Sequence, residues 1–563
     1  MVKKSHVPVM LVCFSFLLNA AFATTYYVKK GGSDENYGNS WDEAFLTITK
    51  ALDVVTSPGA VWVAEGTYQE GGILEDDQDI SLYGGFAGNE TDLSRRDFEN
   101  HKTIIDGEKI YGCVKNYGLL DGFYVTNGKT DIYGGGIYNS LGSVAHCAVY
   151  GNTSGWGAGI YNWEGSVTSC TLHHNTATRN GGGIDNSIGS SMTNCTVYGN
   201  TSDGNGGGIQ NFEGVVDRCT VYGNTSQANG GGISNLKGSV SNCTVYDNSA
   251  EGLFITGGGI HNSEGSVTNC TVYGNAADDS GDGIYNIYSG GSVTGCISWN
   301  HENEDIAGNL TNVSYSCFGE SGGDNHNISS DPMFVNTSGD PSTWDFHLQS
   351  ASPCIDSGTG EGAPDHDIEG VLRPQGDGFD MGAFEYPFPD SAKFISQVAP
   401  LVIPVGEQFD VSIIMKNIGT NTWTTGKSYR LGDCATTNSL WGLSRVPLAP
   451  GETVTPDETT SFTFTITAPG KKGEYDFQWR MIKEPGEKWF GEKTPLVRIS
   501  VSEDIPGDVN NDGSLTMEDV NLLRDHLLGI TLLDPEAMDR AEANLDGRLD
   551  AADMICILLG CSG

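Results

Sequence analysis

The chain carries little positive charge. Its 563 residues include 30 Lys and Arg against 72 Asp and Glu, which gives a formal net charge of −42. A surface of this sign repels phosphate backbones, so nucleic acid is excluded as a principal partner. The acidity favours solubility and the binding of cations instead.

Long apolar runs are also scarce. Residues 7–21 form such a run, between the positive start Lys3-Lys4 and the small-residue site Ala21-Phe-Ala23. This pattern predicts a secretory signal peptide over residues 1–23. No later run is long enough to cross a bilayer, and no cysteine for lipid attachment follows the cleavage site. We therefore expect an extracellular protein, secreted or held at the cell surface, without a membrane span.

The middle of the chain lacks the Leu of leucine-rich repeats and the long Ala, Leu, Glu and Lys runs of helical repeats. It contains instead one sequence unit that is repeated seven times over residues 133–300. Each copy has a Gly-rich turn, an Ile, one variable position and an Asn, and then a short hydrophobic element around a Cys. The Cys recurs every 23 to 27 residues, at Cys147, Cys170, Cys195, Cys219, Cys243, Cys270 and Cys296.

A fixed period of this length predicts a solenoid, in which each repeat buries its apolar face against its neighbours. The apolar pieces are short, β-branched or aromatic, and alternate with polar residues as strands do. We predict a mainly β fold with three short strands per coil, wound as a right-handed parallel β-helix. Identical side chains then stack at about 4.8 Å. The stacked Cys are interpreted as small buried hydrophobes, with occasional pairing left open.

Two columns of Asn recur at the bends between the predicted strands. Stacked Asn side chains can hydrogen-bond amide to amide along the axis, so we interpret both columns as structural. The first column is Asn139, Asn162, Asn186, Asn211, Asn235, Asn262 and Asn286, and the second is Asn152, Asn175, Asn200, Asn224, Asn248, Asn275 and Asn300.

The flanks of the repeats carry the first family resemblance. Val61-Trp-Val-Ala-Glu-Gly-Thr-Tyr68 resembles the first coil of bacterial parallel β-helix surface proteins, and Asp380-Met-Gly-Ala-Phe-Glu385 resembles the end of the choice-of-anchor Q domain. The resemblance implies a pectate-lyase-like solenoid over residues 24–388, with a closing segment at 331–386. Apolar residues at helical spacing over residues 41–55 predict a helix that caps its open end.

Residues 391–502 alternate in polarity as half-buried strands do, which predicts a β-sandwich. The segment contains Trp423, Trp441, Trp479 and Trp489, which we interpret as core or core-edge residues. With these tryptophans the segment resembles the four-tryptophan (FW) Ig-like domain, a spacer or binding module.

Residues 504–563 hold two loops whose oxygen-bearing side chains are spaced for calcium, with Gly at the sixth position where the chain must turn sharply. Helices follow both loops. The segment resembles a type I dockerin, which implies bound Ca²⁺ and a cohesin-type partner. The predicted ligands are Asp508, Asn510, Asp512, Ser514, Thr516 and Asp519 in the first loop, and Glu542, Asn544, Asp546, Asp550 and Asp553 in the second.

Two functions remain open. The first is non-catalytic: an adhesin-like protein that binds a polysaccharide or cell-surface glycan and is docked through its dockerin. Strand alternation predicts an outward aromatic stripe, one ring per coil, on which sugar faces could lie. Its members are Tyr150, His173, Tyr198, Tyr222, Tyr246, Tyr273 and Trp299, and the rings could equally serve as scaffold.

The second function is enzymatic, because β-helices host polysaccharide lyases and glycosidases and dockerins accompany such enzymes. Glycoside hydrolysis needs two placed carboxylates, and a lyase needs a base. The candidate cluster is Asp185 with His173, His174 and Arg179, about one coil apart. The polysaccharide-degrading alternative rests on this cluster and on fold analogy, so we lean towards binding without catalysis.

Overall fold

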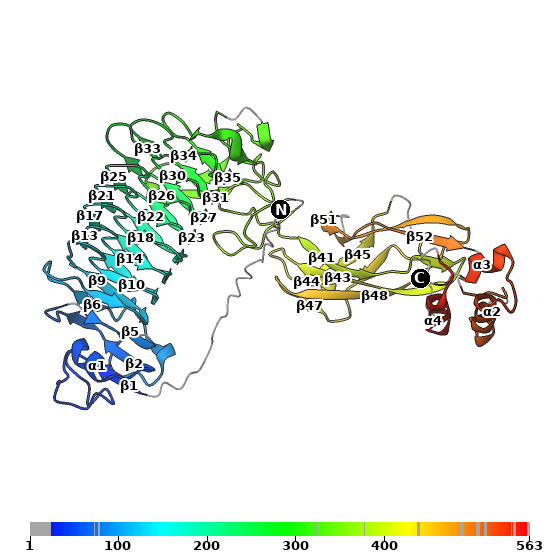
Figure 1. Ribbon diagram of the computed structural model, residues 1–563, viewed down its shortest axis with the longest axis horizontal. Coiled ribbons are helices and arrows are strands. Elements are labelled where there is room, and N and C mark those ends of the chain that lie inside the picture. The colour runs from blue at the N-terminus through cyan, green and yellow to red at the C-terminus, as the bar shows by residue number, and fades with distance from the viewer. Residues whose placement is uncertain are drawn as a thin grey trace. The chain divides into compact units, whose positions relative to one another are not determined.

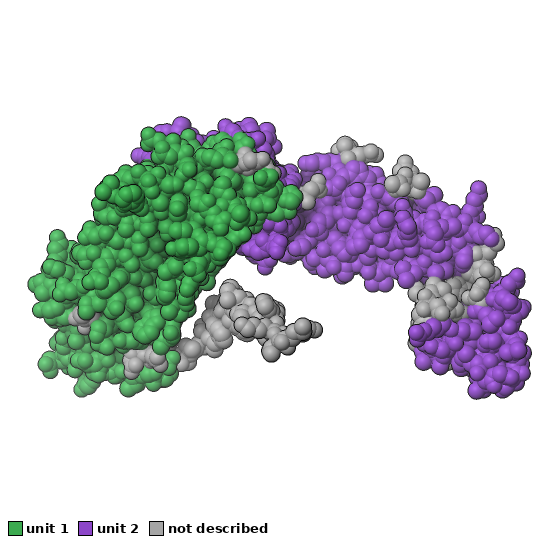
Figure 2. Space-filling view, turned by 45° about the horizontal axis from the view of Figure 1, so that its top comes forward, with its two compact units in different colours: residues 1–329 green, residues 330–563 purple. Residues whose placement is uncertain are grey.

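The computed structural model describes residues 24–563 except for short gaps, so the predicted signal peptide lies outside the described residues. The chain divides into two units, residues 1–329 and 330–563, which Figure 2 colours separately. No helix within the described ranges is long and apolar enough to span a membrane. The gaps are 73, 77–78, 321–323, 377, 436–439, 485–487, 503–506, 512–514, 542, 544–547 and 560–563, together with the side chains of 539, 558 and 559.

The first unit is a stack of coils, and each coil adds short strands to parallel sheets that run along the stack (Figure 1). Sheet A has 12 strands: β1 Thr25–Val28, β2 Gly59–Ala64, β5 Ile80–Phe86, β8 Leu119–Asp121, β11 Ser143–Ala145, β15 Ser166–Thr168, β19 Ser191–Thr193, β23 Val215–Asp217, β27 Ser239–Ser241, β31 Ser266–Thr268, β35 Ser292–Thr294 and β38 Val313–Ser314. Sheet B has 10 strands: β3 Gly66–Tyr68, β6 Thr103–Asp106, β9 Phe123–Thr126, β12 Ala148–Tyr150, β16 Thr171–His173, β20 Thr196–Tyr198, β24 Thr220–Tyr222, β28 Thr244–Tyr246, β32 Thr271–Tyr273 and β36 Ile297–Trp299.

Two further sheets complete the coils. The predicted mainly β solenoid is therefore confirmed, with a fourth short strand in six coils. Sheet C has 10 strands: β4 Leu74–Glu75, β7 Val114–Asn116, β10 Ile137–Ser140, β14 Ile160–Trp163, β18 Ile184–Asn186, β22 Ile209–Phe212, β26 Ile233–Leu236, β30 Ile260–Ser263, β34 Ile284–Ile287 and β37 Ile306–Gly308. Sheet D has 6 strands: β13 Thr153–Ser154, β17 Thr176–Ala177, β21 Thr201–Ser202, β25 Thr225–Ser226, β29 Ser249–Ala250 and β33 Ala276–Ala277.

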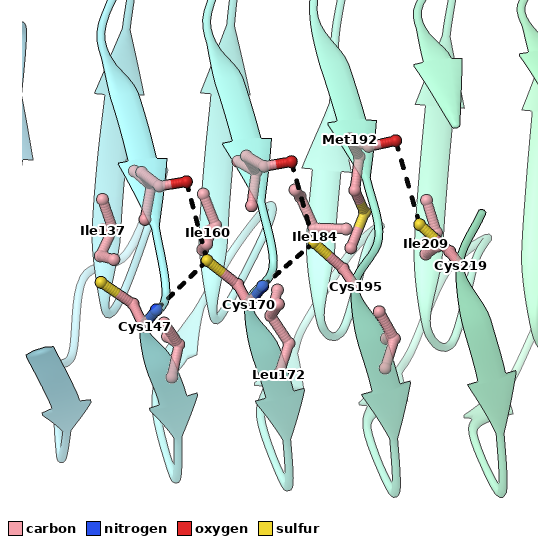
Figure 3. Close-up of a cluster of buried hydrophobic side chains, with 14 of the residues drawn as sticks. Ile137, Cys147, Ile160, Cys170, Leu172, Ile184, Met192, Cys195, Ile209 and Cys219 are labelled. Atoms are coloured by element: carbon pink, nitrogen blue, oxygen red, sulfur yellow. Dashed lines mark hydrogen bonds between the residues drawn. The ribbon is translucent and has the colours of Figure 1, made fainter. Parts of the chain in front are cut away.

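The interior of the solenoid consists of columns of Ile, Val and Cys (Figure 3). The backbone N–H of Cys147 donates to Sγ of Cys170, and that of Cys170 to Sγ of Cys195, at 3.4 Å each. All cysteines that the structure describes are free. Burial raises the pKa of the Cys147 and Cys170 thiols. The column therefore acts as small buried hydrophobes, as the sequence suggested.

Both predicted Asn columns form hydrogen-bonded ladders. In the first, Nδ2 of Asn186 donates to Oδ1 of Asn211 at 2.9 Å, and the ladder extends one coil towards the N-terminus to Asn116. In the second, Nδ2 of Asn200 donates to Oδ1 of Asn224 at 2.9 Å. These bonds satisfy amide groups that are fully or almost fully buried.

The assignment of Asn300 to the second ladder is wrong. Asn300 is exposed and has φ +62°, and the backbone N–H of Asn275 donates instead to Nδ1 of His301 at 3.0 Å. In the preceding coil the left-handed residue before the ladder position is Gly274. Asn300 occupies that left-handed position, so the ladder position falls on His301.

A Gly-x-Gly turn, in most coils a glycine triplet, lies before each sheet C strand from β10 to β34, because the coils touch through backbone there. Gly206 has φ +66°, a left-handed backbone conformation that residues other than glycine adopt with strain. A Cβ added to Gly207 would lie 2.4 Å from the carbonyl oxygen of Gly231 in the next coil. The triplets therefore allow close contact between coils.

The predicted N-terminal helix is shorter than residues 41–55. Helix α1 spans Ile48–Val54 and buries Ile48 and Ala51 on the first coils. Thr47 caps it by accepting from the backbone N–H of Lys50. Trp41 lies outside the helix and packs against Phe86, in a different apolar cluster from α1. The helical spacing therefore joined residues that serve two separate clusters.

The second unit begins with the closing segment, in which β39 (Phe334–Asn336) pairs antiparallel with β40 (Asp345–Leu348). Its centre is the fully buried ion pair Arg373–Glu385, at 2.7 Å.

The chain also contains short 3₁₀ helices: η1 Leu93–Arg95, η2 Leu310–Asn312, η3 Asp324–His326, η4 Pro341–Thr343 and η5 Thr425–Lys427.

A β-sandwich follows, with Trp423, Trp441 and Trp479 fully buried in its core and Trp489 half-buried under Arg445. The tryptophans therefore belong to the core and its edge, as expected. The strands are β41 Ala392–Val398, β42 Val402–Pro404, β43 Gln408–Asn417, β44 Trp423–Thr424, β45 Tyr429–Asp433, β46 Arg445–Pro447, β47 Thr453–Val454, β48 Thr459–Thr467, β49 Gly473–Phe477, β50 Trp479–Lys483, β51 Lys488–Lys493 and β52 Val497–Ser502.

Three helices end the described chain: α2 (Met517–Leu527), α3 (Pro535–Ala541) and α4 (Ala551–Leu559). α2 and α4 follow the two predicted calcium loops. Thr516 caps α2 in a capping box with Asp519. The Thr516 hydroxyl accepts from the backbone N–H of Glu518, and the Asp519 carboxylate accepts from the backbone N–H of Thr516.

We predict that Asn211→Ala opens the first ladder. The side-chain amide of Asn186 would lose its acceptor. The backbone carbonyl of Gly214 and the side-chain oxygen of Asn235 would lose their donor. Buried polar groups left unsatisfied cost about 1–3 kcal/mol each, so we expect a loss of local stability of about 3 kcal/mol. Hydrogen exchange of amides in β18 and β26 measures it. Ser239→Ala, on the outer face of sheet A, is the control, and equal loss of protection in both variants would contradict the prediction.

Candidate functional site

Two columns of outward side chains lie side by side along one edge of the solenoid. One comes from the sheet C strands, where Ile184 and Asn186 point inward and Asp185 points outward. The other comes from the corner before each Gly-x-Gly turn, five residues earlier in the chain. We call both together the sheet C strip: Tyr133, Trp156, Asn180, Asn205, Asn229, Thr256 and Ser280 at the corner, and Tyr138, Tyr161, Asp185, Gln210, Ser234, His261 and Tyr285 on the strands.

The first two coils of the strip form an aromatic cluster. The ring centroids of Tyr133 and Tyr161 lie 4.4 Å apart with the planes tilted by 41°, and Tyr133 also contacts Trp156 at 5.3 Å. Tyr138 stacks on Tyr161 at 5.6 Å. Tyr133 is 42% exposed, so part of this tilted cluster faces solvent.

A groove of about 500 Å³ opens beside this cluster. Tyr133 and Tyr138 line it together with Ile132, Lys115 and Tyr117. The Lys115 ammonium lies 3.2 Å from a carboxylate oxygen of Glu75, so its charge is balanced at the edge of the groove. An apolar wall with a few polar groups is typical of ligand sites.

The next coils of the corner column form a third Asn ladder. The backbone N–H of Asn205 donates to Oδ1 of Asn180, and that of Asn229 to Oδ1 of Asn205, both at 3.0 Å. Thr256 continues it by donating to Oδ1 of Asn229. This ladder fixes the corner residues in register along the strip.

Asp185 lies in the middle of the strip, between Tyr161 and Gln210 on the adjacent strands. It is only 6% exposed, although it points outward, and accepts a hydrogen bond from Ser187 Oγ at 3.0 Å. Burial raises the pKa of its carboxyl to about 7, because the charged form loses its hydration. Asp185 therefore holds its proton up to near-neutral pH.

Two neighbours of Asp185 on the strip are also buried polar groups. Gln210 is 7% exposed, and its Oε1 has no hydrogen-bond partner among the atoms that the structure describes. His261 lies 3.0 Å from Thr256 Oγ1, and burial lowers the pKa of its imidazole to about 4. The strip beyond the aromatic cluster is therefore polar, with His261 uncharged at pH 7 and Asp185 titrating near that pH.

The structure does not bring the four catalytic candidates together. Asp185 belongs to sheet C, whereas His173 and His174 belong to sheet B and the turn after it, with their Nδ1 atoms 2.9 Å apart. Arg179 lies at the corner, with its guanidinium 4.2 Å from the centroid of Trp156. Asp185 and Arg179 border the aromatic cluster, and the two histidines face a different side.

The aromatic stripe on sheet B is a stack of parallel rings. Centroids from Tyr150 through His173 and Tyr198 to Tyr222 and Tyr246 are 4.9–5.0 Å apart, with interplanar angles of 0–11°. Each ring face inside the stack is covered by its neighbour. The stack presents ring edges, so of the two interpretations of this stripe its geometry favours scaffold over a surface for sugar faces. The register continues to Tyr273 and Trp299.

Sequence reasoning missed the strip. The signal was present in the residue that precedes each Gly-x-Gly turn, which changes from aromatic to Asn to hydroxyl while the glycine after it stays constant. The partner column lies five residues further on, and a repeat pattern does not show that these two columns are adjacent.

The predicted calcium ligands are partly described. Asp508 and Asp519, at the two ends of the first loop, are both buried, and Asp519 accepts from the backbone N–H of Val509. Asp553 is likewise buried and accepts from the N–H of Asp550. Buried carboxylates at both ends of an oxygen-rich loop fit a hard cation. Asn510 and Thr516 are also described, whereas Asp512, Ser514, Glu542, Asn544 and Asp546 lie outside the described residues.

Comparison with known families assigns the two C-terminal modules. Residues 400–501 match the family described as the Ig-like domain from next to BRCA1 gene, and residues 506–557 match the dockerin type I domain. The predicted Ig-like and dockerin modules are thereby confirmed. The choice-of-anchor Q and FW assignments stay predictions, and so do the domain boundaries. No curated protein matches the chain significantly.

Solved structures resemble the chain only distantly. One is pectate lyase Pel9A, at 17% identity and a TM-score of 0.45, covering 65% of this chain and 98% of that one. Others are XylC in complex with xylose, at 10% identity, TM-score 0.32 and 70% and 89% coverage, and a rhamnogalacturonan lyase, at 14%, 0.31 and 56% and 91%. Scores this low carry no argument about ligand or activity.

We predict that Asp185→Asn flattens the pH dependence of solenoid stability. The folded-state pKa of about 7 lies above the ordinary value of 3.8, so between these pH values the folded protein holds a proton that the unfolded chain lacks. The carboxyl's contribution to stability therefore falls as pH rises through this window, by at most about 4 kcal/mol.

Thermal unfolding of wild type and variant from pH 4 to pH 8 measures the difference. The wild type should lose stability relative to Asp185→Asn as the pH rises. Asp203→Asn, at an exposed position one coil away, is the control and should follow the wild type. Parallel curves for all three proteins would refute the buried, protonated state of Asp185.

Proposed function

We propose that the protein is an exported modular glycan-binding protein, whose solenoid binds a polysaccharide through the sheet C strip and whose dockerin attaches it to a cohesin-type partner. The observation that carries the binding role is the groove beside Tyr133 and Tyr138. Its aromatic walls, a balanced ion pair and neighbouring amides suit a sugar ring, which offers C–H groups on its faces and hydroxyls at its edge.

The availability of ring faces supports this site over the stripe on sheet B. Tyr133 is tilted against Tyr161, is 42% exposed and lines the groove. The rings of Tyr198 and Tyr222 are parallel at 5.0 Å and cover each other. A sugar can therefore stack at the groove without displacing an aromatic neighbour.

The dockerin provides the attachment. Its two loops supply the oxygen ligands that calcium prefers, and Asp508 and Asp519, buried at the two ends of the first loop, repel one another until a cation is bound. Several apolar side chains of this segment are exposed, as expected of a surface that a partner covers: Met517, Leu527, Leu528, Ile530, Leu532 and Ile555. We propose that calcium orders the loops and that a cohesin-type module covers these residues.

A degradative enzyme is the second candidate, and Asp185 is the observation that favours it. A carboxylic acid that keeps its proton near pH 7 can serve as a general acid. Glycoside hydrolysis also needs a second carboxylate at a defined separation. Among the residues of the sheet C strip, Asp185 is the one carboxylate, so binding is the better supported function.

We predict that Tyr133→Ala with Tyr138→Ala lowers polysaccharide affinity about tenfold or more, because both ring faces of the groove are lost. Affinity electrophoresis against a panel of neutral and acidic polysaccharides measures it. Tyr222→Ala with Tyr246→Ala is the matched control: it removes two rings of the sheet B stack and should lower the thermal midpoint but leave affinity unchanged. The opposite pattern would place the binding face on sheet B.

We predict that Asp519→Ala abolishes the first calcium site and weakens cohesin binding, because the loop loses its buried final carboxylate. Isothermal titration of the full chain with calcium should show one tight site fewer. Asp508→Ala should act similarly, and Glu518→Ala, next to the ligand but exposed, should leave both sites intact. Unchanged stoichiometry in Asp519→Ala would rule out this loop as a calcium site.

A further inference from the structure

The groove occupies one end of the sheet C strip, and the coils beyond it carry a row of polar residues. Each coil contributes one residue from the corner and one from the strand, and the corner Asn ladder keeps them in register. We call these residues the polar row: Asn180, Asp185, Asn205, Gln210, Asn229 and Ser234.

Gln210, at the centre of the polar row, holds an unused hydrogen-bond acceptor. Its Oε1 is buried and has no partner within the described structure, although buried amide oxygens are nearly always bonded. A turn of the terminal amide would bring this oxygen to a ligand above the strip without breaking a hydrogen bond that it makes now. An unsatisfied acceptor of this kind points to a ligand that supplies a donor, such as a hydroxyl.

Near the far end of the strip, one coil before Ser280 and Tyr285, lies a second apolar feature. Leu253 and Phe254 are 88% and 86% exposed, in the longest of the repeats. The loop is held at its base, because Ile255 packs against Ala250 and Ala277 and the backbone N–H of Gly252 donates to Asp278. Thr256, two residues after Phe254, belongs to the corner column. Phe254 is thus an exposed ring on a fixed loop beside the strip.

The coil spacing sets the distance between the two aromatic ends. Tyr133 and Thr256 occupy the same corner position five coils apart, which at about 4.8 Å per coil is about 24 Å. Tyr133 at the groove, Gln210 three coils further on and Phe254 next to the corner residue Thr256 are therefore spread over about five coils along the solenoid axis. A compact ligand cannot reach all three.

We propose that the strip binds an extended, neutral polysaccharide chain lying along the solenoid axis, with Tyr133 and Phe254 contacting sugar rings near the two ends and Gln210 accepting a hydroxyl between them. This rests on the proposed glycan-binding function. The chain is neutral because the polar row is made of amides, a hydroxyl and one acid, and the Lys115 charge is already balanced by Glu75. A polyanion would need cations along its whole length.

The test measures affinity of the full chain for neutral β-linked oligosaccharides of glucan, xylan and mannan, from disaccharide to octasaccharide, by isothermal titration. Affinity should rise about tenfold or more between disaccharide and hexasaccharide, and then level off. Phe254→Ala should lower affinity for the longest oligomers about tenfold and leave the disaccharide unaffected. Leu141→Ala, an exposed apolar residue at a different corner, is the control.

Gln210→Met gives an independent readout. It removes a buried oxygen that has no partner, so the thermal midpoint should stay the same or rise, whereas affinity for long oligomers should fall. A purely structural Gln210 would instead lower the midpoint and leave affinity unchanged, which would overturn its role here.

The remaining outcomes separate this inference from the proposed function. Affinity that depends on Tyr133 but not on chain length or Phe254 would overturn the extended site and keep the groove. Tighter binding of galacturonate oligomers of the same lengths would overturn the neutral class. Failure of every oligosaccharide to bind would overturn both proposals.

Discussion

The in-register contact of each coil with the next is the constraint on which the structure depends. Every sheet C strand pairs in parallel with its equivalent one coil further on, as Ile184 does with Ile209. A side chain therefore has its own counterpart as neighbour, about 4.8 Å away. Only residues that pack well against a copy of themselves are favoured: Ile and Cys by dispersion, Asn by donating its amide to the next amide oxygen. Glycine triplets then let the backbones touch where a Cβ would not fit.

The same contact rule explains why aromatic residues on two faces of one solenoid differ in use. On sheet B each coil places a ring at the same strand position, so Tyr198 and Tyr222 stack and occupy each other's faces. At the corner the aromatic run is interrupted after Trp156 by Asn180, and the rings of Tyr133 and Tyr161 come from different columns. Rings from different columns meet at an angle, which leaves surface for a ligand. Columns that repeat the same residue are therefore suited to a scaffold, and columns in which the residue changes are suited to binding a ligand.

The features that could be predicted from the sequence are those that depend on residues within a single coil or loop. Alternation predicted the strands, the period predicted the Ile, Cys and Asn columns, and loop spacing predicted the calcium module. The strip was not predictable in this way, because the adjacency of Tyr133 and Tyr161 depends on the path of a turn through left-handed glycine. Asp185 looked exposed by alternation, yet Tyr161 and Gln210 on neighbouring coils cover it. Asn300 was misplaced by one residue: the ladder position lies five residues after each Cys, as Asn275 does after Cys270, and the same spacing from Cys296 gives His301.

The loop that carries Phe254 shows how this architecture accommodates a change of length. Its repeat is the longest, yet Thr256 still continues the corner ladder from Asn229, so the additional residues bulge outward and every column stays in register. Duplication or loss of a whole coil, for example residues 205–228, would likewise leave the remaining contacts as they are. Tandem duplication in the gene thus changes the length of a solenoid face in steps of one coil, without requiring any retained residue to mutate.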